Sequence, residues 1–191
     1  MASFDFIEVR PGLTDAEFAD IERRFGFEFA DDHRAFLAVG LPVWTQGDDD
    51  PEQASWGWPD WRDGDPETLQ SQVNWPTTIV RYAVSDGYWP RAWGPRPESP
   101  EAAAVALDAR LADVPRMIPV YAHRYLPAGR GTSGHPVLSV HSLSDTIFYG
   151  RDLAHYIGRE FAADESRDGE EPWTAEATVP FWRDYVSART N

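Results

Sequence analysis

The stretch that decides the fold is Met117–Phe161, which reads MIPVYAHRYLPAGRGTSGHPVLSVHSLSDTIFYGRDLAHYIGREF. Runs rich in β-branched and aromatic residues predict three strands, at 118–126, 136–141 and 145–149. Small and turn-forming residues separate these strands. The apolar residues after Gly150 recur with a helical period and predict an amphipathic helix that ends at Phe161. Three closely spaced strands and one helix favour an antiparallel meander covered by that helix, which is an α+β fold.

The N-terminal region predicts two short helices. Thr14 and Glu17 have the spacing of a capping box, so the first helix begins after Thr14, and Gly26 ends it. The acidic pair at 31–32 provides the N-cap of a second helix, which ends at Gly40. Both helices carry apolar side chains on one face, as a helix that covers a core requires.

The middle of the chain combines aromatic and turn-forming residues. Five Trp side chains lie between residues 41 and 76 and indicate a long loop anchored by aromatic residues, with a helical turn near 66–73. Residues 77–84 predict a strand because β-branched side chains dominate there. Ser99 and Pro100 begin a third helix, and a last helix begins near Pro180.

The composition of the 191 residues predicts one globular domain, since 42% of the residues are hydrophobic. The chain has no Cys, and all 17 of its basic residues are Arg. These two absences exclude thiol nucleophiles, a Walker-type phosphate loop and Schiff-base chemistry. We see neither a signal peptide nor an apolar run of membrane length, so we expect a cytoplasmic protein.

Negative charge is concentrated in two segments of the chain, whose net charge is -15. Residues 45–70 hold eight acids against Arg62, which gives -7, and residues 164–176 hold six acids against Arg167, which gives -5. We interpret 163–175 as an acidic linker. A chain with this charge repels nucleic acid and anionic membranes, and we expect it to bind a basic protein instead.

The first acidic segment, together with its tryptophans, is the partner-binding site that we predict. Trp is enriched at interface hot spots, and surrounding acids speed the encounter with a basic protein. The predicted site residues are Asp48, Asp49, Asp50, Trp58, Asp60, Trp61, Arg62, Asp63 and Asp65. In an alternative interpretation the two tryptophans are core anchors and the acids only keep the loop soluble. Both interpretations hold if the tryptophans are buried and the acids point outward.

Two further patterns have a chemical interpretation. Gly129–Gly134 matches the dinucleotide-binding fingerprint, but a strand follows it where that motif needs a helix, so we favour a flexible hairpin loop. His123, His141 and Asp145 give the alternative of a metal or small-ligand site. Their spacing alone does not bring them together, and core or hydrogen-bonded histidines are the favoured interpretation.

The order of several segments resembles the SUKH superfamily, the Smi/Knr-type domain named after a yeast cell-wall-assembly regulator, and in particular its actinobacterial branch. The segments that carry the resemblance are Phe29–Leu37, Trp58–Arg62, Met117–Pro127, Gly134–His141, Asp145–Gly150 and Pro180–Trp182. The resemblance implies an α+β fold with helices mainly on one face of a largely antiparallel sheet.

The same resemblance implies a function. Many bacterial members of the superfamily are immunity proteins that bind and neutralise a toxin domain, often a nuclease, and the yeast member is a regulatory scaffold. No catalytic motif comes with the family. We therefore expect a non-enzymatic protein without a cofactor, monomeric or weakly dimeric, that binds a basic toxin domain. A metal-dependent hydrolase or small-ligand binder and a regulatory scaffold are the alternatives.

Overall fold

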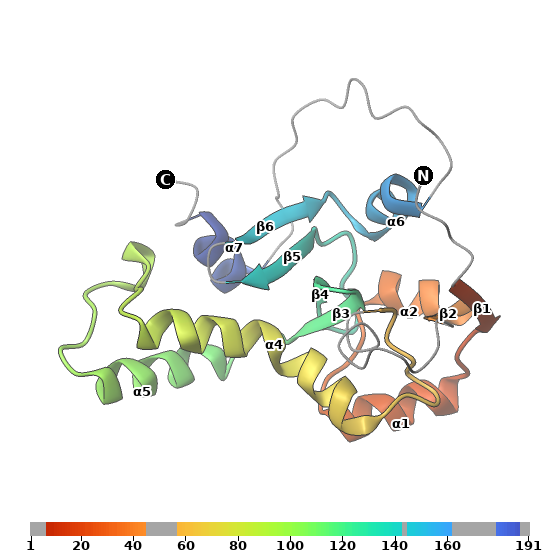
Figure 1. The fold of residues 1–191 in the computed structure, drawn as a ribbon, viewed down its shortest axis with the longest axis horizontal. Coiled ribbons are helices and arrows are strands. Elements are labelled where there is room, and N and C mark those ends of the chain that lie inside the picture. The colour runs from red at the N-terminus through yellow and green to blue at the C-terminus, as the bar shows by residue number, and fades with distance from the viewer. Residues whose placement is uncertain (1–6, 45–56, 143–144, 162–178, 188–191) are drawn as a thin grey trace. The chain divides into compact units, whose positions relative to one another are not determined.

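A computed structural model describes residues 7–44, 57–142, 145–161 and 179–187 (Figure 1). The chain divides into two compact units, one made of Met1–Asn74 and Arg116–Ser133 and the other of Trp75–Pro115 and Gly134–Asn191. Both units contain helices and antiparallel strand pairs, so the predicted α+β class is confirmed. The linker predicted at 163–175 lies outside the described residues.

The first unit contains two helices and four strands. They are β1 (Ile7–Pro11), α1 (Asp15–Phe25), α2 (Asp31–Val39), β2 (Gly40–Trp44), β3 (Met117–Tyr121) and β4 (Arg124–Pro127). β1 pairs with β2, and β3 pairs with β4, in both cases antiparallel. The sequence pattern predicts neither β1 nor β2, because both strands are short and each contains a proline.

The two N-terminal helices form where the sequence predicts them. At α1 the capping box of Thr14 and Glu17 is complete, and Gly26 ends the helix in the left-handed conformation, with φ of 69°. The prediction for the start of α2 was wrong in its detail. The N-cap is Ala30, without a side-chain hydrogen bond, and the acidic pair at 31–32 lies in the first turn, where it complements the helix dipole.

The core of the first unit is dominated by aromatic rings. Phe29 lies at its centre, with its ring edge-on to Phe18, Phe27 and Trp61 at centroid distances of 5.5, 4.9 and 5.4 Å. Leucines, valines and Ile118 from the helices and from β2 and β3 complete this cluster. Edge-to-face packing adds to the area that these rings bury, so the cluster holds both N-terminal helices against the strands.

The strand predicted at 118–126 is in fact two strands, and that prediction was wrong. The chain turns at Ala122 and His123, and β3 and β4 form a hairpin. Ala122 adopts a φ of 48°, which a residue other than glycine rarely does. Its backbone N–H donates to the carbonyl of Gly57 at 3.1 Å, and this long-range bond supports the turn.

The loop expected at 41–76 and the strand expected at 77–84 were also wrong, although the helical turn expected near 66–73 is confirmed as part of a longer helix. Residues 40–44 form β2, and α4 (Pro66–Ser85) is a helix of 20 residues that begins in the first unit and continues into the second. Pro76 lies inside this helix. Leu69, Val73, Val80 and Val84 are all buried and recur with a helical period, so burial of this face outweighs the strand propensity of the β-branched residues.

The second unit contains the end of α4 and further helices around a strand pair. These elements are η1 (Arg91–Trp93), α5 (Pro100–Leu111), β5 (Val137–Ser142), β6 (Asp145–Gly150), α6 (Leu153–Phe161) and α7 (Pro180–Ser187). β5 pairs antiparallel with β6, and both α6 and α7 contact β6. Trp93 stacks on Phe181 at 5.1 Å, and Trp182 is fully buried, so α7 closes an aromatic core.

Candidate functional site

The two tryptophans of the predicted site are buried anchors. Trp58 is 7% exposed and stacks on Phe36 with ring centroids 5.9 Å apart. Trp61 is 4% exposed and contacts the ring of Phe25, besides Phe29, in the aromatic core. These rings hold the loop 57–65 on the first unit, as the core-anchor interpretation describes, and their area is already buried within the unit.

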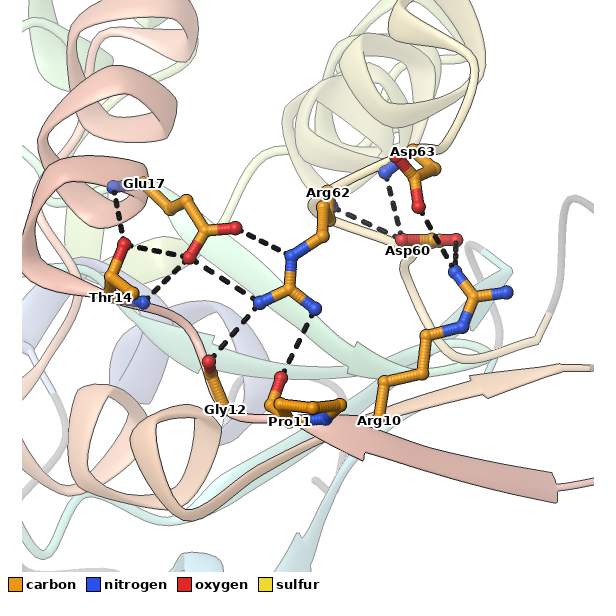
Figure 2. Close-up of polar contacts among 8 residues, drawn as sticks. All are labelled: Arg10, Pro11, Gly12, Thr14, Glu17, Asp60, Arg62 and Asp63. Carbon is orange, nitrogen blue, oxygen red and sulfur yellow. Dashed lines mark hydrogen bonds and ion pairs between the residues drawn. The ribbon is translucent and has the colours of Figure 1, made fainter.

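Arg62 joins this loop to the start of α1 (Figure 2). Its Nε donates to Glu17 Oε1 at 2.5 Å, and Nη2 donates to Glu17 Oε2 at 3.4 Å. Nη1 and Nη2 also donate to the backbone carbonyls of Pro11 and Gly12, each at 3.1 Å. A planar guanidinium with several donors can bind all these acceptors at once, so Arg62 fixes the end of β1, the start of α1 and the loop together.

Glu17 is held ionised by the same contacts. The hydrogen bond from Arg62 lowers the pKa of Glu17 to about 2, and the bonds from the backbone and the hydroxyl of Thr14 act in the same direction. The bond to Glu17 also raises the pKa of Arg62. The capping box and the Arg62–Glu17 ion pair therefore share one carboxylate, which couples the start of α1 to the loop.

Arg10 on β1 binds the two acids that flank Arg62 in this loop (Figure 2). Its Nη1 donates to Asp60 Oδ2 at 3.1 Å and to Asp63 Oδ2 at 3.2 Å. Its Nε donates to Glu8 Oε2 at 3.4 Å. The other carboxylate oxygen of Asp60 accepts the backbone N–H groups of Arg62 and Asp63, at 3.1 and 3.0 Å. Asp60 therefore shapes the loop and is only partly available to a partner.

In these ion pairs, apart from that of Asp60, the carboxylate side chain is more exposed than the arginine. The side chains of Glu8 and Asp63 are 53% and 67% exposed, against 32% for the Arg10 that binds both. The Asp15 side chain is 98% exposed and pairs with Arg34, which is 24% exposed. We name the carboxylates around the start of α1 the carboxylate rim; they are the exposed Glu8, Asp15 and Asp63 and the half-buried Glu17. The rim presents negative charge on a support of partly buried arginines.

The remaining acids of the predicted partner-binding site fall into two groups. Asp65 lies just before α4 and accepts from the backbone N and the hydroxyl of Thr68, at 2.8 and 2.9 Å. These bonds lower the pKa of Asp65 and make it the N-cap of α4. Asp48, Asp49 and Asp50 lie outside the described residues. Thus the structure brings together Asp60, Arg62 and Asp63, adds Arg10 and Glu17 to them, and gives Asp65 a capping role.

The residues of the alternative metal site lie on different elements. His123 is in the turn between β3 and β4 of the first unit, and His141 is an exposed residue of β5 in the second unit. Asp145 begins β6, and its side chain is not among those described. Within the described ranges, no group of three or more His, Asp or Glu side chains is arranged to hold a metal ion.

The glycine-rich loop at 129–134 is bound to the N-terminal helices. The backbone N–H of Gly131 donates to Asp31 Oδ1 at 2.9 Å, and the Arg130 guanidinium pairs with Glu22 and Glu28 at 2.6 and 3.0 Å. The next element is the strand β5, as predicted, where a dinucleotide-binding motif requires a helix. The favoured hairpin-loop interpretation agrees with these contacts, except that the loop is held by charged side chains.

The fold and the site together define an α+β protein with an acidic surface on its first unit. Comparisons with models of protein families, with curated proteins and with solved structures found no match to this chain. Among the helices of the described ranges, none combines the length and the apolar character that crossing a bilayer requires.

Proposed function

We propose that this protein is a non-enzymatic binding domain of the immunity type, which neutralises a basic toxin domain by covering part of its surface with the carboxylate rim. One observation supports the proposal most directly: Asp63 and Asp15 are exposed carboxylates, and each pairs with a partly buried arginine, Arg10 or Arg34. The resemblance to the SUKH superfamily supports the immunity role, and we place that role in the cytoplasm.

The support beneath the rim favours binding in two ways. Arginines that are already paired hold Asp15 and Asp63 in place, so ordering these side chains costs less when a partner binds. The described residues of the first unit also keep an excess of acids over arginines, twelve against eight by count from the sequence, so a negative field remains outside the ion pairs. That field speeds the encounter with a basic surface and disfavours acidic partners.

The position of Arg34 makes the support rigid. Its guanidinium lies over the Phe18 ring, 4.0 Å from the ring centroid, and it pairs outward with Asp15 at 2.5 Å. Phe18 is 1% exposed, so the cation is anchored on the core of the first unit. An outward carboxylate attached in this way is a fixed feature of the surface.

Co-expression with the toxin domains encoded beside the gene tests the proposal. The wild-type protein should protect the cells and form a complex that survives a pull-down. The double variant Asp15→Asn with Asp63→Asn should lose most of the protection, because it removes two charges of the rim. The single variant Asp113→Asn removes an exposed carboxylate of the second unit and should protect as the wild type does. Absence of both protection and complex with the wild type would remove the immunity proposal.

A further inference from the structure

The register between β1 and β2 determines which backbone groups of β1 are used. Val9 lies opposite Pro42, and Pro11 lies opposite Gly40. The two prolines have no backbone N–H to give, and the N–H of Gly40 donates to the carbonyl of Phe36 at the end of α2. Neither pair can therefore exchange the two hydrogen bonds of a hydrogen-bonded pair in an antiparallel ladder.

The hydrogen bonds between β1 and β2 are therefore made by the alternate residue pairs. Hydrogen-bonded and non-hydrogen-bonded pairs alternate along an antiparallel ladder, so Glu8 with Val43 and Arg10 with Leu41 are the bonded pairs. The N–H and C=O groups of Ile7 and Val9 then point away from β2. β1 and β2 form a two-stranded sheet, so among the described residues no further strand pairs with this outer edge.

The outer edge of β1 is open over a short section. At the C-terminal end of β1, Arg62 donates to the carbonyl of Pro11, which points outward in this register. On β2, Pro42 removes the donor that would face outward, which is a common protection of an edge strand. Pro42 thus protects the opposite edge of this sheet, which β2 forms. On the edge that β1 forms, Val9 precedes the occupied carbonyl of Pro11 and has a side chain that is 69% exposed. In the section Ile7–Val9 the backbone groups of Ile7 and Val9 thus point away from β2, and Val9 lies at the surface.

We propose that an extended, basic segment of the partner protein pairs with Ile7–Val9 as an added strand. Charge complementarity selects this occupant, because Glu8 lies within the open section and Asp63 is held by Arg10 of the same strand. A second copy of this chain would bring its own Glu8 and its own net negative charge to the edge, which opposes self-pairing. The proposal rests on the function proposed above and specifies how the basic partner is bound.

A fluorescent hexapeptide of alternating Arg and Val tests this edge by anisotropy at low ionic strength. Val9→Pro removes the outward N–H and leaves both bonded pairs of the ladder in place, so we expect about a tenfold loss of affinity. Val9→Thr keeps the N–H and the strand propensity, and it should bind as the wild type does. Urea denaturation of each variant checks that the first unit stays folded.

N-methylated peptides test the same edge without changing the protein. One peptide is methylated at its odd-numbered amides and the other at its even-numbered amides, with identical side chains. In a strand only alternate amides face a neighbouring strand, so one peptide should bind at least tenfold more weakly than the other. This comparison remains decisive if Val9→Pro does not fold.

The outcomes distinguish strand addition at the outer edge of β1 from binding at the carboxylate rim. Equal affinities of both methylated peptides and the unmodified peptide, or no binding of the unmodified peptide to the wild type, overturn the edge proposal. If the peptide binds the wild type and Asp63→Asn weakens this binding while Val9→Pro does not, the rim proposal stands alone. If Asp63→Asn has no effect, the rim proposal fails separately. Self-association of the wild type in sedimentation that Val9→Pro abolishes would assign the edge to a second copy and contradict the basic occupant.

Discussion

The hydroxyl of Tyr125 on β4 donates to the backbone carbonyl of Gln72 in α4, at 3.1 Å. In a regular helix this carbonyl accepts the N–H of the residue four positions later, which here is Pro76 and has no N–H to give. Gln72 is buried and Tyr125 is fully buried, so water does not replace the missing donor. Tyr125 thus supplies the hydrogen bond that the proline removes from the helix, and its burial raises the pKa of its hydroxyl.

The first prediction concerns this bond. Tyr125→Phe keeps the ring and leaves the carbonyl of Gln72 buried without its donor, so it should lower the free energy of unfolding by about 1–3 kcal/mol. Urea denaturation measures this change. Pro76→Ala provides the matched background, because it restores an N–H at the position that faces Gln72. There Tyr125→Phe should cost less than half as much, and an equal cost in both backgrounds would show that the proline is irrelevant to the bond.

The second prediction concerns the shared carboxylate of Glu17. Its pKa of about 2, against an ordinary value of 4.5, means that the stability from its ionised form is present above pH 4.5 and is lost as the pH falls through about 2. In Arg62→Gln the pKa should rise toward 4.5, because the main hydrogen bond to the carboxylate is gone. Carboxyl resonances followed by NMR across pH measure both values. Arg10→Gln is the control, since Arg10 binds Asp60 and Asp63 and not Glu17. A Glu17 pKa that stays low in Arg62→Gln would contradict the conclusion that Arg62 lowers it.

The third prediction concerns the acid sensitivity of His33. This residue of α2 is 1% exposed beside the Phe29 ring, and burial lowers its pKa to about 3 from an ordinary 6.5. The unfolded chain therefore takes up the proton first, and stability should fall as the pH drops from 6.5 toward 3, by at most about 1.4 kcal/mol per pH unit from this group. His33→Phe should remove this part of the slope in urea denaturation at a series of pH values. An identical slope in the variant would mean that other groups control the acid sensitivity.

The fourth prediction uses a pair of glycines. A Cβ at Gly12 would lie 1.9 Å from the backbone oxygen of Ala38, so Gly12→Ala should destabilise the first unit by about 3 kcal/mol or more. Gly158 in α6 has open space around it and lies within a helix. Gly158→Ala should therefore stabilise the protein by up to about 1 kcal/mol. Thermal unfolding compares the two, and a Gly12→Ala midpoint equal to that of the wild type would refute the close approach between these backbones.

Local signals in the sequence were sufficient for the N-caps of α1 and α5, but not for that of α2. Thr14 and Glu17 predict the start of α1, because a capping box depends on residues three positions apart. Ser99 and Pro100 predict the start of α5 in the same way. The strands β5 and β6 were predicted because a short turn pairs neighbouring segments of the chain.

Elements that depend on distant contacts were not predictable from local patterns. The turn at Ala122 has no glycine, asparagine or proline, and the carbonyl that supports it comes from Gly57. In α4 a helical turn was predicted at 66–73 and a strand at 77–84, whereas one helix continues through Pro76 and Tyr125 of β4 supplies the hydrogen bond that the proline cannot donate. The helical period of apolar residues continues across Pro76 and identifies the helix, because the buried residues before and after the proline lie on the same helix face.

The candidate site likewise has residues that the sequence predicts and residues that only the fold brings to it. The sequence points to Asp60, Arg62 and Asp63 through composition, and it gives the tryptophans as anchors in one of its two interpretations. It offers no signal for Arg10 or Arg34, because each pairs with an acid far along the chain and β1 itself was not predicted. The support of the rim is therefore a product of the fold.

The association rate between the protein and the toxin domain proposed as its partner, measured by stopped flow at several salt concentrations, tests the central claim most directly. We expect the double variant Asp15→Asn with Asp63→Asn to associate about three- to tenfold more slowly at low salt, and with a weaker salt dependence, than wild type or Asp113→Asn. An association rate and salt dependence in the double variant equal to those of the wild type would contradict the claim that the carboxylate rim receives the partner.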